Sequence, residues 1–278
     1  MKTKSMFSSE RQSRRFFSIG IGVAALAILT APLLYAQEQP AATPKPIQEG
    51  KGHRFVCTDY IAGKVFIVNA EGKVEWEYST GQCNDVWALP NGNLLFNTGH
   101  GVREVTREKT VVFNYESSSE VYACQRLTNG NTFIAECSSG RLLELAPDGK
   151  VVKEVRLLPA GKDGGHGYMR NARQLPNGNY LVAHYSEQVV REYDSQGLKV
   201  REIPAPGGPH SVIRLPNGNT IMSNWLGHGQ FGKAPHLIEV TRDKRVLWTF
   251  SDHQTIKTVS SVQLLDVPGD ATKGEVWH

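Results

Sequence analysis

The stretch Leu89-Pro90-Asn91-Gly92-Asn93 decides the fold of this chain, because it returns three times. The copies are Leu127-Thr128-Asn129-Gly130-Asn131, Leu175-Pro176-Asn177-Gly178-Asn179 and Leu215-Pro216-Asn217-Gly218-Asn219. Their glycines are spaced by 38, 48 and 40 residues, a period typical of a repeated supersecondary unit. Asn-Gly between apolar runs predicts a tight β-hairpin, and we expect a type I′ turn with positive φ at both central residues.

A second turn repeats with the same period, out of phase with the first. Its five copies lie at 69–73, 106–109, 146–150, 194–197 and 241–244. Short strand-forming runs separate the turns; in the second repeat they are 85–89, 94–98, 102–106 and 111–115. Four-stranded sheets at this period bury both faces only when they are arranged radially and cover one another. The sequence therefore predicts an all-β fold, a β-propeller of four-stranded blades.

The two ends of the repeat region predict how the ring is completed. The first repeat offers strands at 54–59, 64–69 and 74–78 but no innermost strand before them. The C-terminal run 261–265 (SVQLL) aligns with 211–215 (SVIRL), which begins the fifth repeat. We therefore expect five blades, with the C-terminal strand completing the first blade and closing the ring. The tail Glu275-Val276-Trp277 leaves a sixth blade open.

The N-terminus has the character of an export signal. Residues 1–36 combine a basic start with an apolar run, and Ser13-Arg14-Arg15-Phe16-Phe17 is similar to the twin-arginine motif. We expect cleavage after Ala36; the alternative is an uncleaved membrane anchor. Residues 37–52 are rich in Pro, Gln and Ala and predict a linker, so the propeller domain is expected over 53–278. The predicted location is periplasmic or secreted, through the twin-arginine pathway.

The charge balance excludes one class of partner. The first 36 residues hold five of the 31 Lys and Arg and one of the 27 Asp and Glu, which leaves 26 of each in the remainder. A neutral mature chain lacks the basic surface that nucleic acid or an anionic membrane requires. Membrane contact is expected only if the signal segment stays uncleaved.

The cysteines exclude some cofactor sites. The four cysteines form no CxxC and no CxxCH, which excludes c-type haem attachment and the common zinc spacings. An exported chain permits a disulfide, and buried free thiols are the alternative. The four positions are Cys57, Cys83, Cys124 and Cys137.

Aromatic closing strands carry a resemblance to a known family. The runs VEWEY (74–78), VVFNY (111–115) and VLWTF (246–250) resemble those of exported bacterial β-propeller proteins with PQQ-binding-like repeats. The resemblance covers nearly all of the chain after the linker and implies the fold. It does not imply quinone binding, because quinone-dependent dehydrogenases are longer and have more blades. The LPNGN turns are also similar to those of arylsulfotransferases.

The repeat register separates two rims of the predicted propeller. Both kinds of turn fall on one rim and hardly vary, which is typical of a structural role. The other rim collects the entries of the innermost strands and the exits of the second strands, and it varies from repeat to repeat, as a binding face does. The candidate ligand-binding residues there are Asn84, Tyr122, Asn171, Tyr185, Trp225, His166 and His228. The candidate catalytic residues are Arg170, His184 and His210.

Other polar residues are given structural roles. The glutamates that recur in the third strands predict ion pairs, two of them beside Arg103 and Arg191. These glutamates are Glu104, Glu144, Glu192 and Glu239. The histidines expected to be ordinary surface or core residues are His53, His236, His253 and His278.

Three functions compete. The first is a binding propeller that holds a small polar molecule or glycan, with no cofactor. The second is implied by the arylsulfotransferase resemblance: His210 takes a sulfuryl group, with Arg170 and His184 as charge stabilisers. The third is a hydrolase or lactonase, which alone requires a divalent metal ion, held by Glu136, His184 and Asn224.

Overall fold

The computed structural model describes residues 52–204, 211–273 and 275. The chain divides into two compact units, Met1–Ala41 and Ala42–His278, and every described residue belongs to the second. The predicted signal peptide and all of the predicted linker except Gly52 therefore lie outside the described residues. Within the described part of the chain, no helix is long and apolar enough to cross a membrane.

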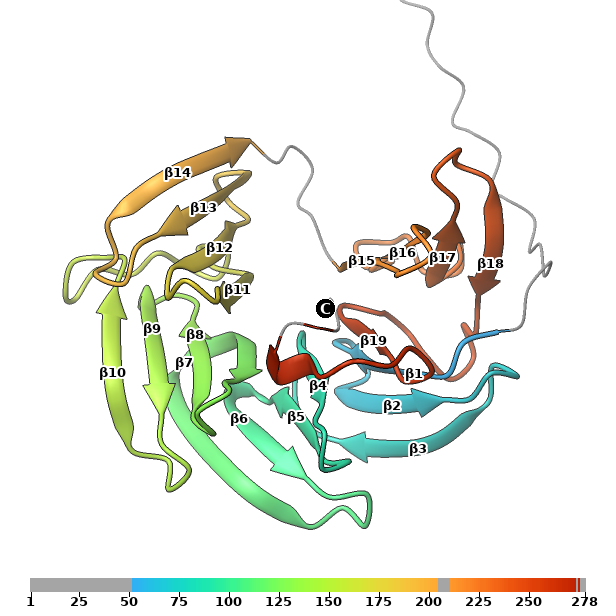
Figure 1. The fold of residues 1–278 in the computed structure, drawn as a ribbon, viewed down its shortest axis with the longest axis horizontal. Helices are drawn as coiled ribbons and strands as arrows, with labels where there is room; N and C mark the ends of the chain where they lie inside the picture. Colours follow the sequence, from blue (N-terminus) through green and yellow to red (C-terminus); the bar gives the residue numbers. More distant parts are fainter. Residues whose placement is uncertain (1–51, 205–210, 274, 276–278) are drawn as a thin grey trace, which may run out of the picture. The chain divides into compact units, whose positions relative to one another are not determined.

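The described domain is all-β, as predicted, and its strands form antiparallel sheets (Figure 1). Repeat 1 consists of β19 (Val262–Leu264), β1 (Phe55–Asp59), β2 (Lys64–Val68) and β3 (Val74–Ser79). Repeat 4 consists of β11 (Asn171–Gln174), β12 (Tyr180–His184), β13 (Val189–Tyr193) and β14 (Lys199–Pro204). Repeat 5 consists of β15 (Val212–Arg214), β16 (Thr220–Ser223), β17 (Leu237–Val240) and β18 (Val246–Phe250).

Repeats 2 and 3 are fused into one seven-stranded sheet, where two separate sheets were expected. Its strands are β4 (Val86–Ala88), β5 (Leu94–Asn97), β6 (Gly99–Val105), β7 (Val111–Arg126), β8 (Thr132–Glu136), β9 (Arg141–Leu145) and β10 (Val151–Arg156). The 16-residue β7 pairs with β6 through its first half and with β8 through its second. No glycine or proline interrupts 111–126, so the strand continues from one repeat into the next.

The C-terminal strand completes the sheet of repeat 1. β19 pairs antiparallel with β1, with Leu264 opposite Phe55 and Val262 opposite Cys57. The expected pairing of the last strand with the first repeat is therefore present. A short 3-10 helix at Ala271–Lys273 follows β19. Val276 and Trp277, which left a sixth blade open, lie outside the described residues.

The LPNGN turns differ from the type I′ turns expected. Leu89 N–H donates to Asn93 O, and Gly92 N–H donates to Leu89 O, both at 2.9 Å. Gly92 has φ of 85°, and Asn91 is absent from the positive-φ residues. This is a three-residue loop, a type I turn with Pro90 at its second position followed by a left-handed glycine. The prediction of a hairpin was right and its turn type was wrong, because the loop also takes in the residue before Asn-Gly. That residue is Pro90 here and Thr128 in the second copy, which has the same hydrogen bonds.

The recurring glutamates hold these turns. The last asparagine of each LPNGN turn donates its side-chain amide to the third-strand glutamate of the same repeat, at 2.6 to 2.7 Å. The pairs are Asn93–Glu104, Asn131–Glu144, Asn179–Glu192 and Asn219–Glu239. Arg103 and Arg191 pair instead with Glu116 and with Glu187 and Glu202. Glu104 and Glu192 do form ion pairs, as predicted, but with Arg126 and Arg201.

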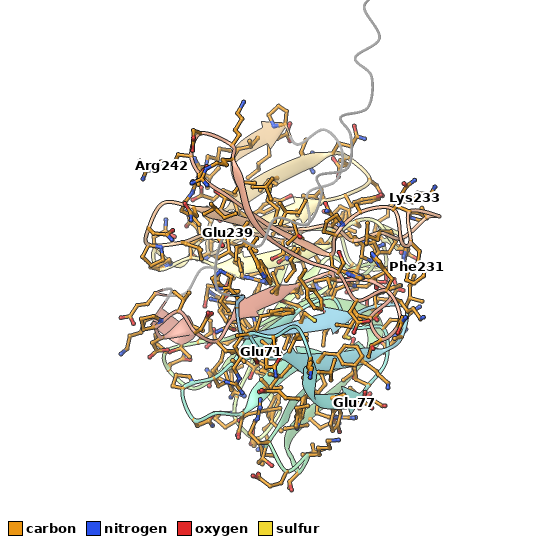
Figure 2. The ribbon with its side chains drawn as sticks, turned by 90° about the vertical axis from the view of Figure 1, so that its right-hand side faces the viewer. Glu71, Glu77, Phe231, Lys233, Glu239 and Arg242 are labelled. Atoms are coloured by element: carbon orange, nitrogen blue, oxygen red, sulfur yellow. The ribbon has the colours of Figure 1, made fainter. Side chains whose placement is uncertain are left out.

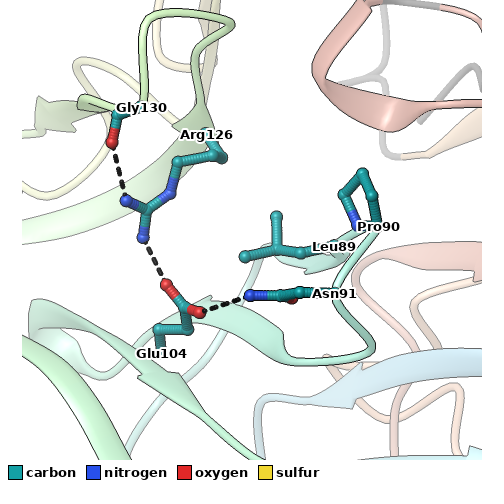
Figure 3. Close-up of a pocket in the computed structure, with 6 residues that line it drawn as sticks. All are labelled: Leu89, Pro90, Asn91, Glu104, Arg126 and Gly130. Atoms are coloured by element: carbon teal, nitrogen blue, oxygen red, sulfur yellow. Dashed lines mark hydrogen bonds and ion pairs between the residues drawn. The ribbon is translucent and has the colours of Figure 1, made fainter.

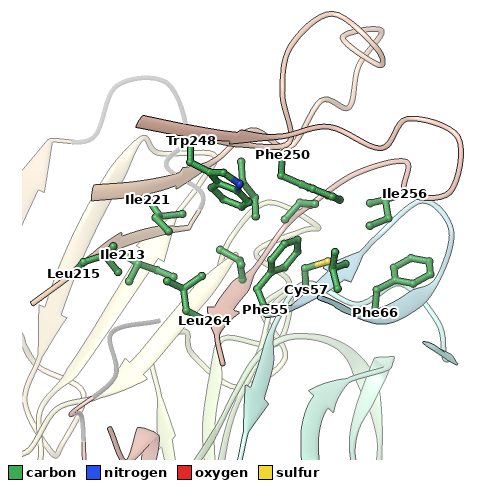
Figure 4. Close-up of a cluster of buried hydrophobic side chains, with 14 residues drawn as sticks. Phe55, Cys57, Phe66, Ile213, Leu215, Ile221, Trp248, Phe250, Ile256 and Leu264 are labelled. Carbon is green, nitrogen blue, oxygen red and sulfur yellow. The ribbon is translucent and has the colours of Figure 1, made fainter. Parts of the chain in front are cut away.

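The core lies in layers between neighbouring sheets. Figure 4 shows one such layer, in which Phe55 and Phe66 of repeat 1 face Ile221 and Trp248 of repeat 5. Three further clusters join repeats 1 and 2, 2 and 3, and 3 and 4. The four cysteines are buried and free, as in the second of the two alternatives left by the sequence.

Polar side chains link the innermost strands where the sheets converge. Gln263 on β19 bonds both the N–H and the C=O of Ala88 on β4, at 2.8 and 3.4 Å. Asp85 receives two hydrogen bonds from Arg173 on β11, each of 2.8 Å, and its side chain is fully buried. These contacts hold the innermost strands of different repeats in one register and so align their ends.

Candidate functional site

The two ends of the sheets are different in kind. One end, here the turn rim, carries the LPNGN turns and the outer turns such as 241–244. The opposite end, here the loop rim, carries the entries to the innermost strands and the exits of the second strands. Figure 2 shows both ends for repeat 5, with Arg242 of the outer turn on one side and Phe231 and Lys233 of the loop rim on the other.

Aromatic side chains from several repeats meet on the loop rim. The ring of Tyr60, which follows β1, lies 6.5 Å from that of Tyr122 on β7 and 6.4 Å from that of Trp225, which follows β16. The guanidinium of Arg170 lies 4.5 Å above the ring of Tyr122 and 5.6 Å from that of Tyr185. We call these five residues the aromatic mouth. They come from repeats 1, 3, 4 and 5.

The aromatic mouth holds one cation without an opposite charge. The side chain of Arg170 contacts the faces of two tyrosines, and among the described residues it has no recorded hydrogen bond or ion pair. A guanidinium stacked on aromatic faces is positioned by them while its five N–H donors stay available. The nearby acidic groups Glu120 and Asp85 are, in contrast, bound by His166 and Arg173.

A carboxylate–histidine pair lies beside the aromatic mouth. Glu120 Oε2 lies 2.9 Å from His166 Nδ1, and Tyr122 Oη lies 3.1 Å from both groups. The carboxylate favours the proton on Nδ1, which leaves the lone pair of a neutral imidazole on Nε2. Burial, together with the hydrogen bond to Tyr60, raises the pKa of Tyr122, so its hydroxyl stays protonated. His166 itself is 56% exposed.

The backbone beside Trp225 is strained. Leu226 and His228 have φ of 59° and 50°, a region that non-glycine residues rarely adopt. A Cβ on Gly227 would lie 2.2 Å from the indole of Trp225, so only glycine allows the ring to pack there. The ring of His228 lies 4.9 Å from that of Trp225. Strain of this kind is typical of functional sites, where the surrounding structure maintains it.

Unsatisfied polar atoms occur where the innermost strands begin. Asn84 Nδ2, Ser211 Oγ and Ser260 Oγ are buried and have no hydrogen-bond partner among the described residues. They precede β4, β15 and β19, on the same rim as the aromatic mouth. Asn171, another predicted ligand-binding residue, begins β11 directly after Arg170. Asn84 and Ser260 share one register position and Ser211 lies one position further along its strand. Buried polar groups almost always have partners, so these atoms indicate places where a water or a ligand binds.

The predicted role of His184 must be corrected. Its side chain is buried between Tyr168 and Tyr193 instead of facing the other strand entries. Nδ1 donates to Tyr168 O at 2.9 Å, and Nε2 accepts from the Tyr193 hydroxyl at 2.8 Å. Burial lowers the pKa of His184 to about 4. With both nitrogens occupied, this neutral histidine has no free atom for catalysis or for a metal ion.

The other predicted metal ligands are also engaged. Glu136 bonds Ser117, Ser139 and Arg141 at 2.7 to 2.8 Å. Asn224 donates its amide to Pro235 O at 2.8 Å. Across the described ranges, no group of three or more His, Cys, Asp or Glu side chains is arranged to hold a metal ion. His210, the candidate nucleophile, lies outside the described residues.

A hollow of about 260 Å³ lies on the turn rim rather than the loop rim (Figure 3). Glu104 bonds Arg126 there at 2.5 Å, and Arg126 donates to Gly130 O at 2.9 Å. Asn91 donates to the same carboxylate at 3.4 Å. Because its charged groups satisfy one another, we assign this hollow to the packing of neighbouring turns.

Sequence reasoning missed two members of the site. Tyr60 follows β1. It lies one position beyond the place in its repeat that corresponds to Tyr185 and Trp225 in theirs. Glu120 was overlooked because it lies in a run of polar residues in the middle of β7. The alternation of Glu120 and Tyr122 on one strand, facing the histidine loop, is the signal that could have found it.

No family model matches this chain, and no curated protein matches it. Among solved structures, it is similar to a protein of unknown function from Bacteroides caccae, with TM-score 0.68 and 21% identity over 76% of this chain and 98% of that chain. A streptogramin B lyase gives TM-score 0.45 and 15% identity over 75% of this chain and 69% of that chain. The WD40 β-propeller domain of Doa1 gives TM-score 0.41 and 16% identity over 53% of this chain and 48% of that chain. These likenesses concern the all-β, propeller-like fold and leave the activity open.

Proposed function

We propose that this chain is an exported five-bladed β-propeller that binds a small polar molecule or glycan at the aromatic mouth. The observation that carries the proposal is the contact of Arg170 with Tyr122 and Tyr185, which continues through Tyr60 to Trp225. Arg170 has no acidic partner among the described residues. Binding sites combine aromatic walls with a few polar groups that fix orientation, and the mouth has both. Tyrosine and tryptophan supply a large contact area at low entropic cost.

Binding is tested by a thermal-shift and tryptophan-fluorescence screen of neutral and acidic sugars with the full chain. Trp225→Ala should abolish the response to any sugar that binds. The matched control is Trp76→Ala on β3, because Trp76 is also stacked on a tyrosine and flanked by two cations, but away from the mouth. Equal loss in both variants, or no response to any sugar, would contradict the proposal.

The Glu120–His166 pair favours a second candidate function, an enzyme that uses acid–base chemistry. A histidine whose Nδ1 is fixed by a carboxylate can take a proton at Nε2. The geometry supports this better than a metal-dependent hydrolase, because Glu136 and His184 are engaged elsewhere. Bound sugars should then be converted, and His166→Gln should stop conversion while leaving binding in place. A ligand recovered unchanged after prolonged incubation supports binding alone.

Export is proposed from the twin-arginine-like sequence. Replacing Arg14 and Arg15 together with lysine should leave precursor in the cytoplasm, because that pathway reads the arginine pair. Immunoblots of cytoplasmic and periplasmic fractions measure this. Undiminished delivery of the variant would point to the general secretory route.

A further inference from the structure

We infer that the ligand of the aromatic mouth is an acidic sugar, whose carboxylate binds Arg170 and whose hydroxyls bind the polar atoms at the strand entries. The inference rests on the proposed function and names its ligand class. Two independent observations carry it. One is the guanidinium of Arg170, which has no acidic partner among the described residues, and the other is the set of buried atoms that have no hydrogen-bond partner within the same ranges.

The charge argument comes from the acids around Arg170. Asp85 is bound by both terminal nitrogens of Arg173, and Glu120 is bound by His166. Arg170, in contrast to Arg173, has no acidic partner among the described residues. A planar guanidinium and a carboxylate form two parallel hydrogen bonds, so a carboxylate is the anion that fits this group best.

The hydroxyl argument comes from the strand entries. Asn84 Nδ2 can only donate, whereas the hydroxyls of Ser211 and Ser260 can donate and accept. Their residues precede innermost strands of repeats 2, 5 and 1, at the end where Arg170 precedes β11. A polyhydroxylated ring satisfies such a mixed set of donors and acceptors, and its apolar face can pack on the tyrosines. A simple carboxylic acid satisfies Arg170 only.

Isothermal titration of the full chain with D-glucuronate, D-glucose and acetate tests the inference. Glucuronate should bind at least about tenfold more tightly than glucose, because a hydrogen bond to a charged group is worth more than a neutral one. Acetate should bind more weakly than glucuronate, since it lacks the hydroxyls. Glucose and glucuronate binding with equal affinity would overturn the inference and leave the proposed function standing. Failure of every sugar would overturn both.

Variants distinguish the contribution of the sugar's carboxylate from that of its hydroxyls. Arg170→Gln should remove the preference for glucuronate over glucose, whereas Asn84→Ala should weaken both sugars without removing the preference. The matched control is Arg156→Gln on β10, an arginine of the outer strand that pairs with Glu154. A preference that survives in Arg170→Gln, or is lost in Arg156→Gln, contradicts the assignment.

The sugar acid can come from a free monosaccharide or from the end of a polysaccharide. Comparing glucuronate with an oligouronide of several units distinguishes these sources. Tighter binding of the oligomer indicates a chain that extends past Tyr185, which is 42% exposed. Equal affinity per acidic end indicates recognition of a single sugar. Both outcomes support an acidic sugar as the ligand. Failure of the protein to bind either compound overturns it.

Discussion

The turn rim and the loop rim are built from the same repeats, yet their polar groups are used in opposite ways. On the turn rim, the asparagine of each LPNGN turn is bound by a glutamate of its own repeat, and the pattern recurs four times. On the loop rim, as far as the structure describes the chain, Arg170 lacks an acidic partner, and Asn84 and Ser260 carry buried atoms without a hydrogen-bond partner. Satisfied polar groups stabilise the fold, and unsatisfied ones are available to a ligand.

Repeat 1 shows why the turn rim is monotonous. Its innermost and second strands, β19 and β1, come from the two ends of the domain and are not joined by a turn. The third-strand position that holds glutamate in the other repeats is Ile67 here, and it is fully buried. The glutamate is therefore present where there is a turn to hold and absent where there is none. The repetition on this rim follows from hairpin geometry.

The largest expected effect is loss of the fold when β19 is removed. Deleting residues 260–278 exposes the hydrogen-bonding edge of β1 and the apolar side chains of Phe55 and Phe66, and should cause aggregation. Deleting 268–278, which keeps β19, should leave the protein folded and lower its melting temperature only slightly. Size-exclusion chromatography and thermal melting measure both. A monomeric first variant with unchanged melting would break the argument that this strand completes the domain.

Acid should destabilise the folded protein through its two buried histidines, His184 and His236. The pKa values of His184 and His236 are lowered to about 4, first by burial. The unfolded chain binds these protons near pH 6.5, so stability is full above pH 6.5 and falls as the pH drops toward 4. Each histidine accounts for a loss of up to about 3 kcal/mol, measured by urea unfolding across this range. His184→Gln should flatten the pH dependence of the free energy of unfolding.

The two rims should separate stability from binding. Gly130→Val should cost about 2 kcal/mol, because φ is 85° and valine resists it, while nothing lies within 4 Å of the added Cβ. Its sugar affinity should stay unchanged. Arg170→Gln should change stability by less than about 0.5 kcal/mol and lose selectivity for acidic sugars. The reverse result, with binding lost in the turn variant and only stability lost in the other, would show that the site lies on the turn rim.

The smallest expected effect is a gain. Lys109 and Lys244 occupy the glycine position of two outer turns, with φ of 69° and 68°. Lys244→Gly should relieve this strain and stabilise the fold by about 0.5 to 1 kcal/mol, measured by urea denaturation. Lys73→Gly, which follows the glycine of its turn, serves as the control and should bring no gain. A destabilised Lys244→Gly would show that its side chain contributes more than the backbone strain costs.

The sequence by itself determined the all-β fold, the repeats, the hairpins and the pairing of the last strand with the first repeat. These features depend on local rules, namely turn residues and alternation along strands, that act within one hairpin. The same rules placed Tyr122, Arg170, Tyr185 and Trp225 at one rim. The turn type was wrong because the loop takes in the residue before Asn-Gly, which is proline in three copies and Thr128 in the fourth.

Only the tertiary structure decided which of the rim residues meet. His184 ends a strand at the same height as Asn224, yet its ring lies inside the apolar layer with Tyr168 and Tyr193. Tyr60 reaches the rings of Tyr122 and Trp225 from different repeats. Strand alternation no longer fixes side-chain direction beyond the last paired residue, where the backbone adopts positive φ, as at 226 and 228. Those directions are set by packing between sheets, which a single repeat does not encode.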